Sequence, residues 1–376
     1  MDDGINPILR TILEGVYDTT SPLNNLRYTP HLVQKIWKDI VEYWKSMIKI
    51  GVDIESDPEL NKAALLHQCK WDRYFQLSTP DVFFLRCSPI TFPKPKDINI
   101  NMMPFKMCHK FEDCYLPKNL RQYWKLLIQP LLSTERQASA KFEAEKICFL
   151  TIQESIVSCN KSQRRAGLHT ETPGTIKIFD KHVDPKSKAA YAAEEDEING
   201  GGLSEFYIHY VHWGQDFWAE DMVKGGIYMA SNVPESCGVW NSKIECDESG
   251  GQREIIGKNG DIGFLRPYIG KQTIMLPNVM YWITDRTPHE SLPLKEETYR
   301  QYFRLVTHQV SLWFEDHSTK NPFGLVPDPN ITKIIRGSKF EDPQQLRVVD
   351  PEELKVTKER KTFLTLMKEM IGRGNN

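Results

Sequence analysis

The sequence lacks most of the motifs that identify a common enzyme class. None of its eight cysteines forms a Cys-x-x-Cys pair. We therefore expect neither a zinc finger nor a redox dithiol, and we expect the cysteines to be free thiols. His-Glu-x-x-His, Gly-x-Ser-x-Gly and Walker patterns are also missing. Their absence disfavours zinc proteases, serine hydrolases and P-loop proteins.

The sequence also lacks features that would direct it to an export route or a membrane. Residues 1–7 (MDDGINP) contain no basic residue and no apolar run, and no window approaches ~18 uninterrupted apolar residues. We therefore expect no membrane span and a cytoplasmic location, with the nucleus left open.

No excess of charge of one sign is present. The 48 basic and 50 acidic residues give a net charge of −2, so duplex nucleic acid is not an expected partner, although a local basic groove stays open. Apolar residues make up 40% and charged residues 26% of the 376 positions, as in a folded globular chain. A small-molecule substrate is favoured, and the oligomeric state is left open.

The first 150 residues are expected to be mainly helical. Thr29 and Pro30 are typical of a helix start, apolar residues recur at helical spacing up to Ile48, and Gly51 is a plausible stop. Six prolines between 80 and 117 predict loops and short edge strands. Further helices are expected over 119–132 and 134–157.

From about residue 165 the pattern changes to short β-rich segments separated by turns. Strands are expected over 175–179, 205–212, 226–230, 238–240, 261–265, 273–276, 279–283 and 299–314. Such a series is typical of a sandwich or barrel. We therefore predict an α+β chain with a helical region over 1–150, a β core over 151–330 and a charged tail over 331–376 that includes a helix within 351–371. The segment 186–202 reads as a mobile loop.

Two distant segments carry the residues that suggest chemistry. Residues 165–174 read RAGLHTETPG, and on an extended chain His169 and Glu171 would point to the same side. Further along lies His289, followed by a β-rich stretch on which Arg300 and Arg304 share a face. Two arginines that face a barrel interior need anionic partners.

In these residues the chain resembles the iron(II)/2-oxoglutarate-dependent oxygenases. That superfamily carries a His-x-Asp/Glu pair early in a double-stranded β-helix, a distal His late in it, and an Arg ten to fifteen positions further on. The spacing here is similar to the taurine-dioxygenase and phytanoyl-CoA-hydroxylase branches. The likeness spans roughly residues 150–327, and the acid is Glu where Asp is commoner.

The resemblance implies a jelly-roll, cupin-like core and a dioxygenase, expected to be a hydroxylase. His169, Glu171 and His289 would hold Fe(II), a face that suits this metal. Arg300 would bind the remote carboxylate of the cosubstrate 2-oxoglutarate, and Arg304 an acidic substrate group or a structural carboxylate. O2 would be the second cosubstrate, and ascorbate an additive in vitro.

Other interpretations stay open at the level of the sequence. Asn232 lies between the elements of the triad and could touch substrate or cosubstrate, or simply form a turn. The same barrel and metal could belong to a cupin-like metalloprotein that does not use 2-oxoglutarate. The barrel could also be catalytically inactive and serve as a binding module.

Overall fold

The computed structural model describes ten stretches of the chain: residues 30–51, 83–133, 144–173, 176–180, 204–208, 211–214, 217–219, 222–245, 255–341 and 346–349. Most of their regular structure is β-sheet, and the few helical segments make the chain α+β. Among these residues no helix is long and apolar enough to cross a membrane.

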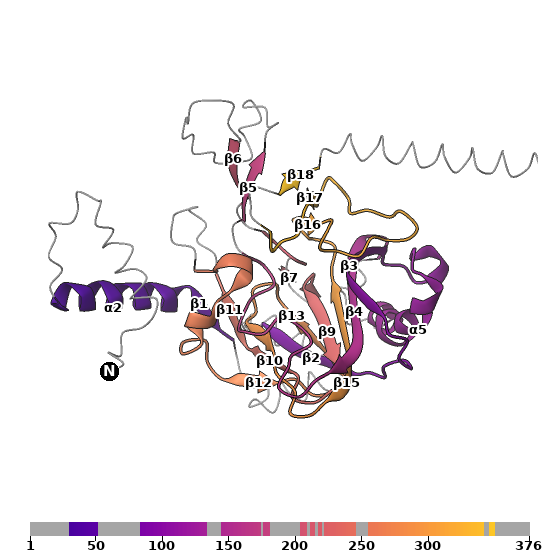
Figure 1. The fold of residues 1–376 in the computed structure, drawn as a ribbon, viewed down its shortest axis with the longest axis horizontal. Helices are drawn as coiled ribbons and strands as arrows, with labels where there is room; N and C mark the ends of the chain where they lie inside the picture. The colour runs from indigo at the N-terminus through magenta and orange to yellow at the C-terminus, as the bar shows by residue number, and fades with distance from the viewer. Residues whose placement is uncertain are drawn as a thin grey trace, which may run out of the picture.

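A six-stranded antiparallel sheet forms the centre of the molecule (Figure 1). Its order is β2 (Phe84–Pro89), β13 (Val279–Ile283), β9 (Ile227–Ser231), β15 (Thr298–Val306), β4 (Ile147–Val157) and β3 (Asn99–Lys106). The longest pairing joins β15 to β4, from Thr298 opposite Val157 to Val306 opposite Phe149. Every residue of β9 is buried, as expected of a central strand with both faces covered.

One face of this sheet packs against a short helical segment. The segment consists of α5 (Arg121–Tyr123), a π-helical turn over Trp124–Ile128 and α6 (Gln129–Ser133). The buried side chains of Leu127 and Ile128 belong to the same apolar core as Trp282 and Phe303 of the sheet. Removing that apolar surface from water is the main stabilising contribution here.

A smaller antiparallel sheet carries part of the candidate site. It consists of β12 (Gln272–Ile274), β10 (Cys237–Trp240) and β14 (His289–Ser291). The helix α2 (Pro30–Ser46) leads into β1 (Ile48–Ile50), which pairs with β11 (Ser242–Ile244). The remaining strands are β5 (Ile176–Asp180), β6 (Ser204–Ile208), β7 (Phe217–Ala219), β8 (Met222–Lys224), β16 (Leu312–Phe314), β17 (Lys333–Arg336) and β18 (Arg347–Val348). Among the strands that the structure describes, only β16 and β17 pair in parallel.

Short 3-10 turns complete the described elements. They cover Phe111–Asp113, Lys118–Leu120, Lys258–Gly260 and Gly263–Leu265.

Several predicted elements are confirmed. The structure has the expected α+β class, the helix that begins at Pro30 and the helical segment near 119–132. The proline-rich stretch 80–117 supplies β2 and β3, which lie at the two edges of the large sheet. Edge positions tolerate the missing N–H of proline, which accounts for their location.

Other predictions were wrong. The helix expected over 134–157 is the strand β4 from Ile147 onward, and residue 150 therefore falls inside a strand. The strand expected over 261–265 is a 3-10 turn at Gly263–Leu265. The long strand expected over 299–314 is divided into β15 and β16. The loop at 186–202 and the helix expected within 351–371 lie outside the described residues.

Candidate functional site

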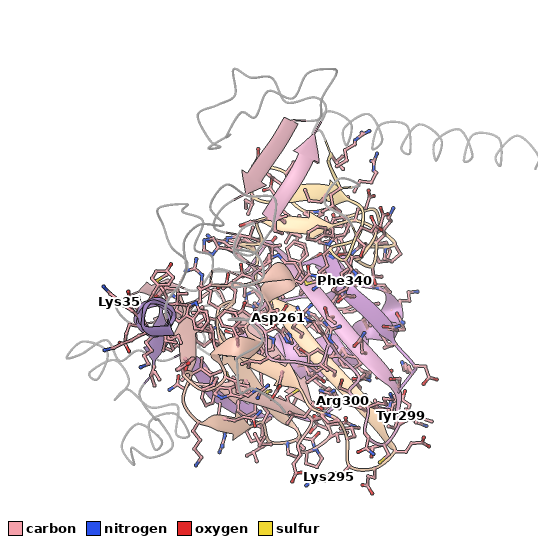
Figure 2. The ribbon with its side chains drawn as sticks, turned by 60° about the vertical axis from the view of Figure 1, so that its left-hand side comes forward. Lys35, Asp261, Lys295, Tyr299, Arg300 and Phe340 are labelled. Carbon is pink, nitrogen blue, oxygen red and sulfur yellow. The ribbon has the colours of Figure 1, made fainter. Side chains whose placement is uncertain are left out.

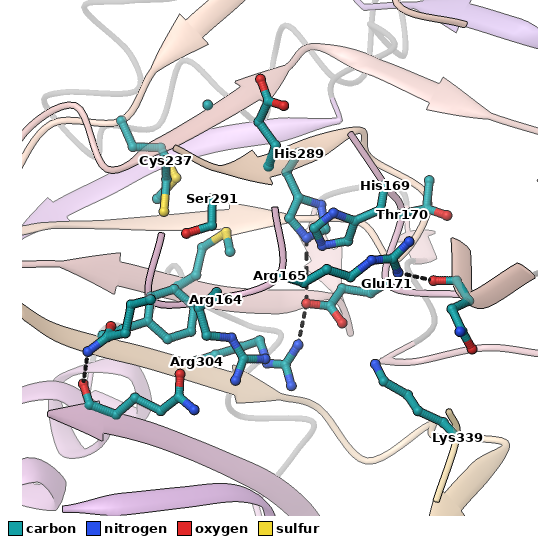
Figure 3. A pocket seen from close by; sticks show the side chains of 18 of the residues that line it. Arg164, Arg165, His169, Thr170, Glu171, Cys237, His289, Ser291, Arg304 and Lys339 are labelled. Carbon is teal, nitrogen blue, oxygen red and sulfur yellow. Dashed lines mark hydrogen bonds and ion pairs between the residues drawn. The ribbon is translucent and has the colours of Figure 1, made fainter. Parts of the chain in front are cut away.

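A cavity of about 220 Å³ lies among residues from both sheets and the loop before His169 (Figure 3). His169, Glu171, His289 and Arg304, all predicted as site residues, line it. The other lining residues are Gln153, Gln163, Arg164, Arg165, Thr170, Met229, Cys237, Gly238, Asn259, Met275, Glu290, Ser291, Tyr302, His317, Lys339 and Phe340. Two sequence segments more than a hundred positions apart therefore meet at one wall.

Backbone pairing brings the two histidines together. His169 and His289 form an antiparallel bridge in which each N–H donates to the other's carbonyl, both at 3.0 Å. Their ring centroids are 4.5 Å apart. His289 lies in the strand β14, whereas His169 lies outside the named strands and forms isolated bridges. The two histidines therefore lie side by side, and isolated bridges to Asp261 and His289 hold His169 where the sequence predicted an extended strand.

Glycine at position 260 allows the loop of His169 to approach closely. The Thr170 N–H donates to the Gly260 carbonyl at 2.9 Å. Gly260 has a φ of +85°, and a Cβ there would lie 2.3 Å from the Thr170 carbonyl oxygen. Only glycine accommodates both the backbone angle and this approach.

Each imidazole is oriented by a hydrogen bond between its Nδ1 atom and a backbone carbonyl. The Nδ1 atom of His169 is 2.6 Å from the Gly167 carbonyl oxygen, and that of His289 is 2.9 Å from the Thr287 carbonyl oxygen. A carbonyl can only accept, so each Nδ1 is the donor. In a neutral ring Nε2 then keeps its lone pair, which is the arrangement that metal-binding histidines adopt.

The charges around Glu171 favour its carboxylate form. Glu171 is buried, which opposes ionisation, but the guanidinium of Arg304 and the imidazole of His289 outweigh this effect and hold its pKa well below the usual range. The Nε2 atom of His289 is 3.5 Å from Glu171 Oε1. Burial, together with neighbouring His289, lowers the pKa of His169 to about 3, so this imidazole is neutral near pH 7.

The guanidinium of Arg304 contacts two side chains of the site, Glu171 and Thr151. One terminal nitrogen pairs with Oε1 of Glu171 and the other donates to Thr151 Oγ1 at 3.3 Å. The sequence left Arg304 open between a substrate acid and a structural carboxylate. In the structure its partner is the carboxylate of Glu171.

Arg300 is fully buried and pairs with no carboxylate among the residues that the structure describes. It donates to the hydroxyls of Ser231 and Ser291 at 3.2 and 3.1 Å and to the sulfur of Cys237 at 3.0 Å. Arg300 itself is absent from the cavity lining, but its partners Ser291 and Cys237 line the cavity. A buried cation without a counter-ion is costly, so an anionic ligand would be stabilised beside it.

The donor set fits a metal ion in its chemistry, although Arg304 competes for it. Two imidazole Nε2 atoms and one carboxylate suit Fe(II). Within the described stretches, however, no group of three or more His, Cys, Asp or Glu side chains is already arranged around one point to hold a metal. The ion pair between Glu171 and Arg304 provides a physical reason, because it occupies one carboxylate oxygen.

Asn232 lies away from the cavity and contacts the backbone of β15. Its Oδ1 accepts the Gln301 N–H at 2.7 Å and its Nδ2 donates to the Tyr299 carbonyl at 3.4 Å. It is absent from the cavity lining. The amide therefore fixes the turn after β9 against β15, and a direct role in cofactor binding stays a prediction.

Sequence reasoning missed several polar residues of the cavity. Arg164 and Arg165 directly precede the His169 segment, and their adjacency was a signal that could have drawn attention to them. Lys339 lies far along the chain in a segment expected to be a tail, and no local pattern marked it. Its place depends on the pairing of β16 with β17.

Comparisons with known proteins provide no assignment. No family model matches the chain, and no curated protein does. Among solved structures, the crystal structure of AviO1 from Streptomyces viridochromogenes Tue57 is aligned at 8% identity over 60% of this chain and 90% of that chain, with a TM-score of 0.24. A likeness this weak carries no argument about fold or function.

Proposed function

We propose that the chain is an Fe(II)/2-oxoglutarate-dependent oxygenase built on a double-stranded β-helix, with a small molecule as its substrate to be hydroxylated. The observation that carries the proposal is the meeting of His169, Glu171 and His289 at one wall of the cavity, with both Nδ1 atoms directed to backbone carbonyls. These three would hold the metal. Bound Fe(II) and 2-oxoglutarate would supply an oxidative decarboxylation that gives succinate and CO2 and delivers one oxygen atom to the substrate.

The chain's own residues would bind and orient the cosubstrate. Arg300 would bind the remote carboxylate; its guanidinium donates to the hydroxyl oxygens of Ser231 and Ser291 at 3.2 and 3.1 Å, and these contacts hold it in place. A charge-assisted pair in this buried setting would be strong. Apolar residues of the lining, such as Met229 and Met275, would help to exclude water from the reacting centre.

Arg304 would act on Glu171 rather than on the cosubstrate. While it occupies Oε1, the second carboxylate oxygen is left for a metal. Arg304 would thereby keep Glu171 ionised and fix the direction in which its carboxylate points.

One observation favours a second candidate, a metal-free binding module. The Glu171–Arg304 ion pair satisfies the carboxylate without a metal, and no described group is already arranged as a metal cage. In that case the cavity would bind a ligand without turning it over.

Two measurements separate these candidates. Isothermal titration should show about one Mn(II) per chain, and Fe(II), 2-oxoglutarate and ascorbate should together yield succinate. His289→Ala should abolish both signals, because two ligands hold the metal far more weakly than three. His109→Ala, at an exposed position away from the cavity, is the matched control and should leave both unchanged.

Other outcomes identify the alternatives. Metal binding without succinate would favour a cupin-like metalloprotein. No metal binding by the unaltered protein would refute the oxygenase and favour the binding module.

A further inference from the structure

The cavity wall carries more positive charge than its acidic residues balance. Two acids line it: Glu171 pairs with Arg304, and Glu290 accepts from both terminal nitrogens of Arg266 at 3.0 and 2.6 Å. The lining cations Arg164, Arg165 and Lys339 are left. None of these three pairs with a carboxylate within the described part of the chain.

These three side chains reach the cavity from two separate segments (Figure 3). The Arg164 guanidinium lies over the Tyr302 ring, 5.4 Å from its centroid. Arg165 donates to the Asn259 carbonyl. The Lys339 ammonium lies 5.2 Å from the centroid of the Trp213 ring. Contacts with rings and a neutral carbonyl position these charges without neutralising them.

The neighbouring cations make this arrangement unfavourable without a ligand. Burial lowers the pKa of Lys339 to about 8; Glu171 opposes this effect, and the nearby charges of Arg304, Arg164 and Arg165 add to it. Burial and the charge of Arg304 also lower the pKa of Arg164. A bound anion would relieve both the desolvation and the repulsion.

Hydrogen-bonding groups in the same cavity also lack partners. The Oε1 atoms of Gln153 and Gln163 are buried acceptors without a hydrogen bond, and Nε of Arg304 is a buried donor without one. The Gln163 amide is held by its Nε2 atom, which donates to Ser155 Oγ at 3.0 Å and to the Arg300 carbonyl at 3.1 Å. Buried acceptors of this kind are normally satisfied, and hydroxyl groups of a ligand would satisfy them.

We propose that the cavity binds a small phosphate monoester with a hydroxylated carbon skeleton, its phosphate on Arg164, Arg165 and Lys339 and its hydroxyls on Gln153 and Gln163. A dianion with three terminal oxygens matches three cations better than a single carboxylate does. Bidentate contact with arginine suits phosphate geometry. That this phosphate monoester is the substrate rests on the proposed function, whereas its binding to the cavity does not depend on turnover.

Calorimetry on the full chain with Mn(II) and 2-oxoglutarate under argon tests the inference, with glycerol 3-phosphate as probe. Arg164→Ala and Lys339→Ala should each weaken binding by about tenfold or more, which corresponds to ~1.4 kcal/mol for one lost charge-assisted contact. Lys118→Ala removes an exposed lysine away from the cavity and should leave the affinity unchanged. Gln163→Leu should weaken glycerol 3-phosphate but not methyl phosphate.

Defined results would overturn the inference. Equal affinity for glycerol 3-phosphate in the Arg164→Ala, Lys339→Ala and unaltered proteins would show that these residues do not bind the phosphate. Glycerate binding as tightly as glycerol 3-phosphate would show a carboxylate site instead. Probe binding that appears only when 2-oxoglutarate is left out would assign these cations to the cosubstrate. Binding of 2-oxoglutarate alone, titrated first in each protein, reports on the proposed function separately.

Discussion

At the scale of single residues, the two buried arginines of β15 have different surroundings despite their common face. Arg300 contacts two hydroxyls and a sulfur, whereas Arg304 contacts Glu171. The sequence indicated that both need anionic partners. It could not show which partner each arginine has, because Ser231, Ser291 and Glu171 reach the strand from three other segments.

Arg300→Ala is expected to raise the apparent KM for 2-oxoglutarate by about 30-fold or more. Losing a buried charge-assisted pair costs ~2 kcal/mol or more, and each ~1.4 kcal/mol is a factor of ten. Arg300→Lys keeps the charge but loses the planar guanidinium. Its KM for 2-oxoglutarate should therefore lie between those of the unaltered protein and Arg300→Ala. Steady-state succinate formation at varied 2-oxoglutarate measures both.

Arg304→Ala provides the contrasting variant. It should leave the KM for 2-oxoglutarate near that of the unaltered protein and change the affinity for Mn(II), because Glu171 loses its partner. The reverse pattern, with Arg304 controlling 2-oxoglutarate, would contradict the assignment of Arg300. Thermal unfolding of each variant verifies that it is folded.

At the scale of elements, the loop that carries His169 depends on one close backbone approach. Gly260→Ala should destabilise the protein by ~2 kcal/mol or more, because a positive φ and a Cβ at 2.3 Å from a carbonyl oxygen add their costs. Mn(II) affinity should fall with it. Denaturant unfolding and metal titration are the measurements.

Gly324→Ala is the matched control for this substitution. Gly324 also has a positive φ, +76°, but a Cβ there would meet nothing within 4 Å. It should therefore show the cost of the backbone angle alone, ~1 kcal/mol, without loss of metal binding. Equal effects of the two substitutions would show that the approach to Thr170 is unimportant.

The elements also show where local sequence patterns fail. Residues 147–157 contain Glu and Gln among apolar residues, which favoured a helix, yet they form β4. Glu154 is buried in this strand and accepts from the Tyr123 hydroxyl at 2.7 Å and from Gln301 Nε2 at 2.8 Å. Those partners come from distant segments, so tertiary contacts decided the conformation. By contrast, the β-branched and aromatic composition of 279–283 was sufficient to predict β13.

At the scale of the whole molecule, the large sheet joins the two regions that the sequence separated at residue 150. β2, β3 and the start of β4 precede that position, and β9, β13 and β15 follow it. Composition revealed a change to short β-rich segments from about residue 165. It could not reveal that the earlier strands pair with the later ones, because pairing depends on long-range contacts.

A fragment of residues 151–376 is therefore expected not to fold by itself. It would lose both edge strands of the sheet. It would also lose the helical segment whose Leu127 and Ile128 cover an apolar face of that sheet. Its thermal melt should show no cooperative transition, while the full chain melts cooperatively. A cooperative melt of the fragment would instead support an independent β domain with a boundary near 150.

The pairing of β4 with β15 has a consequence for synthesis in the cell. Glu154 and Gln301, which meet across these strands, are 147 positions apart. At ~5–20 residues per second, β15 leaves the ribosome about 7 to 30 s after β4. During that interval β4 has β3 on one side but no partner on the other, so we expect the nascent chain to be a client for chaperones that shield unpaired edges.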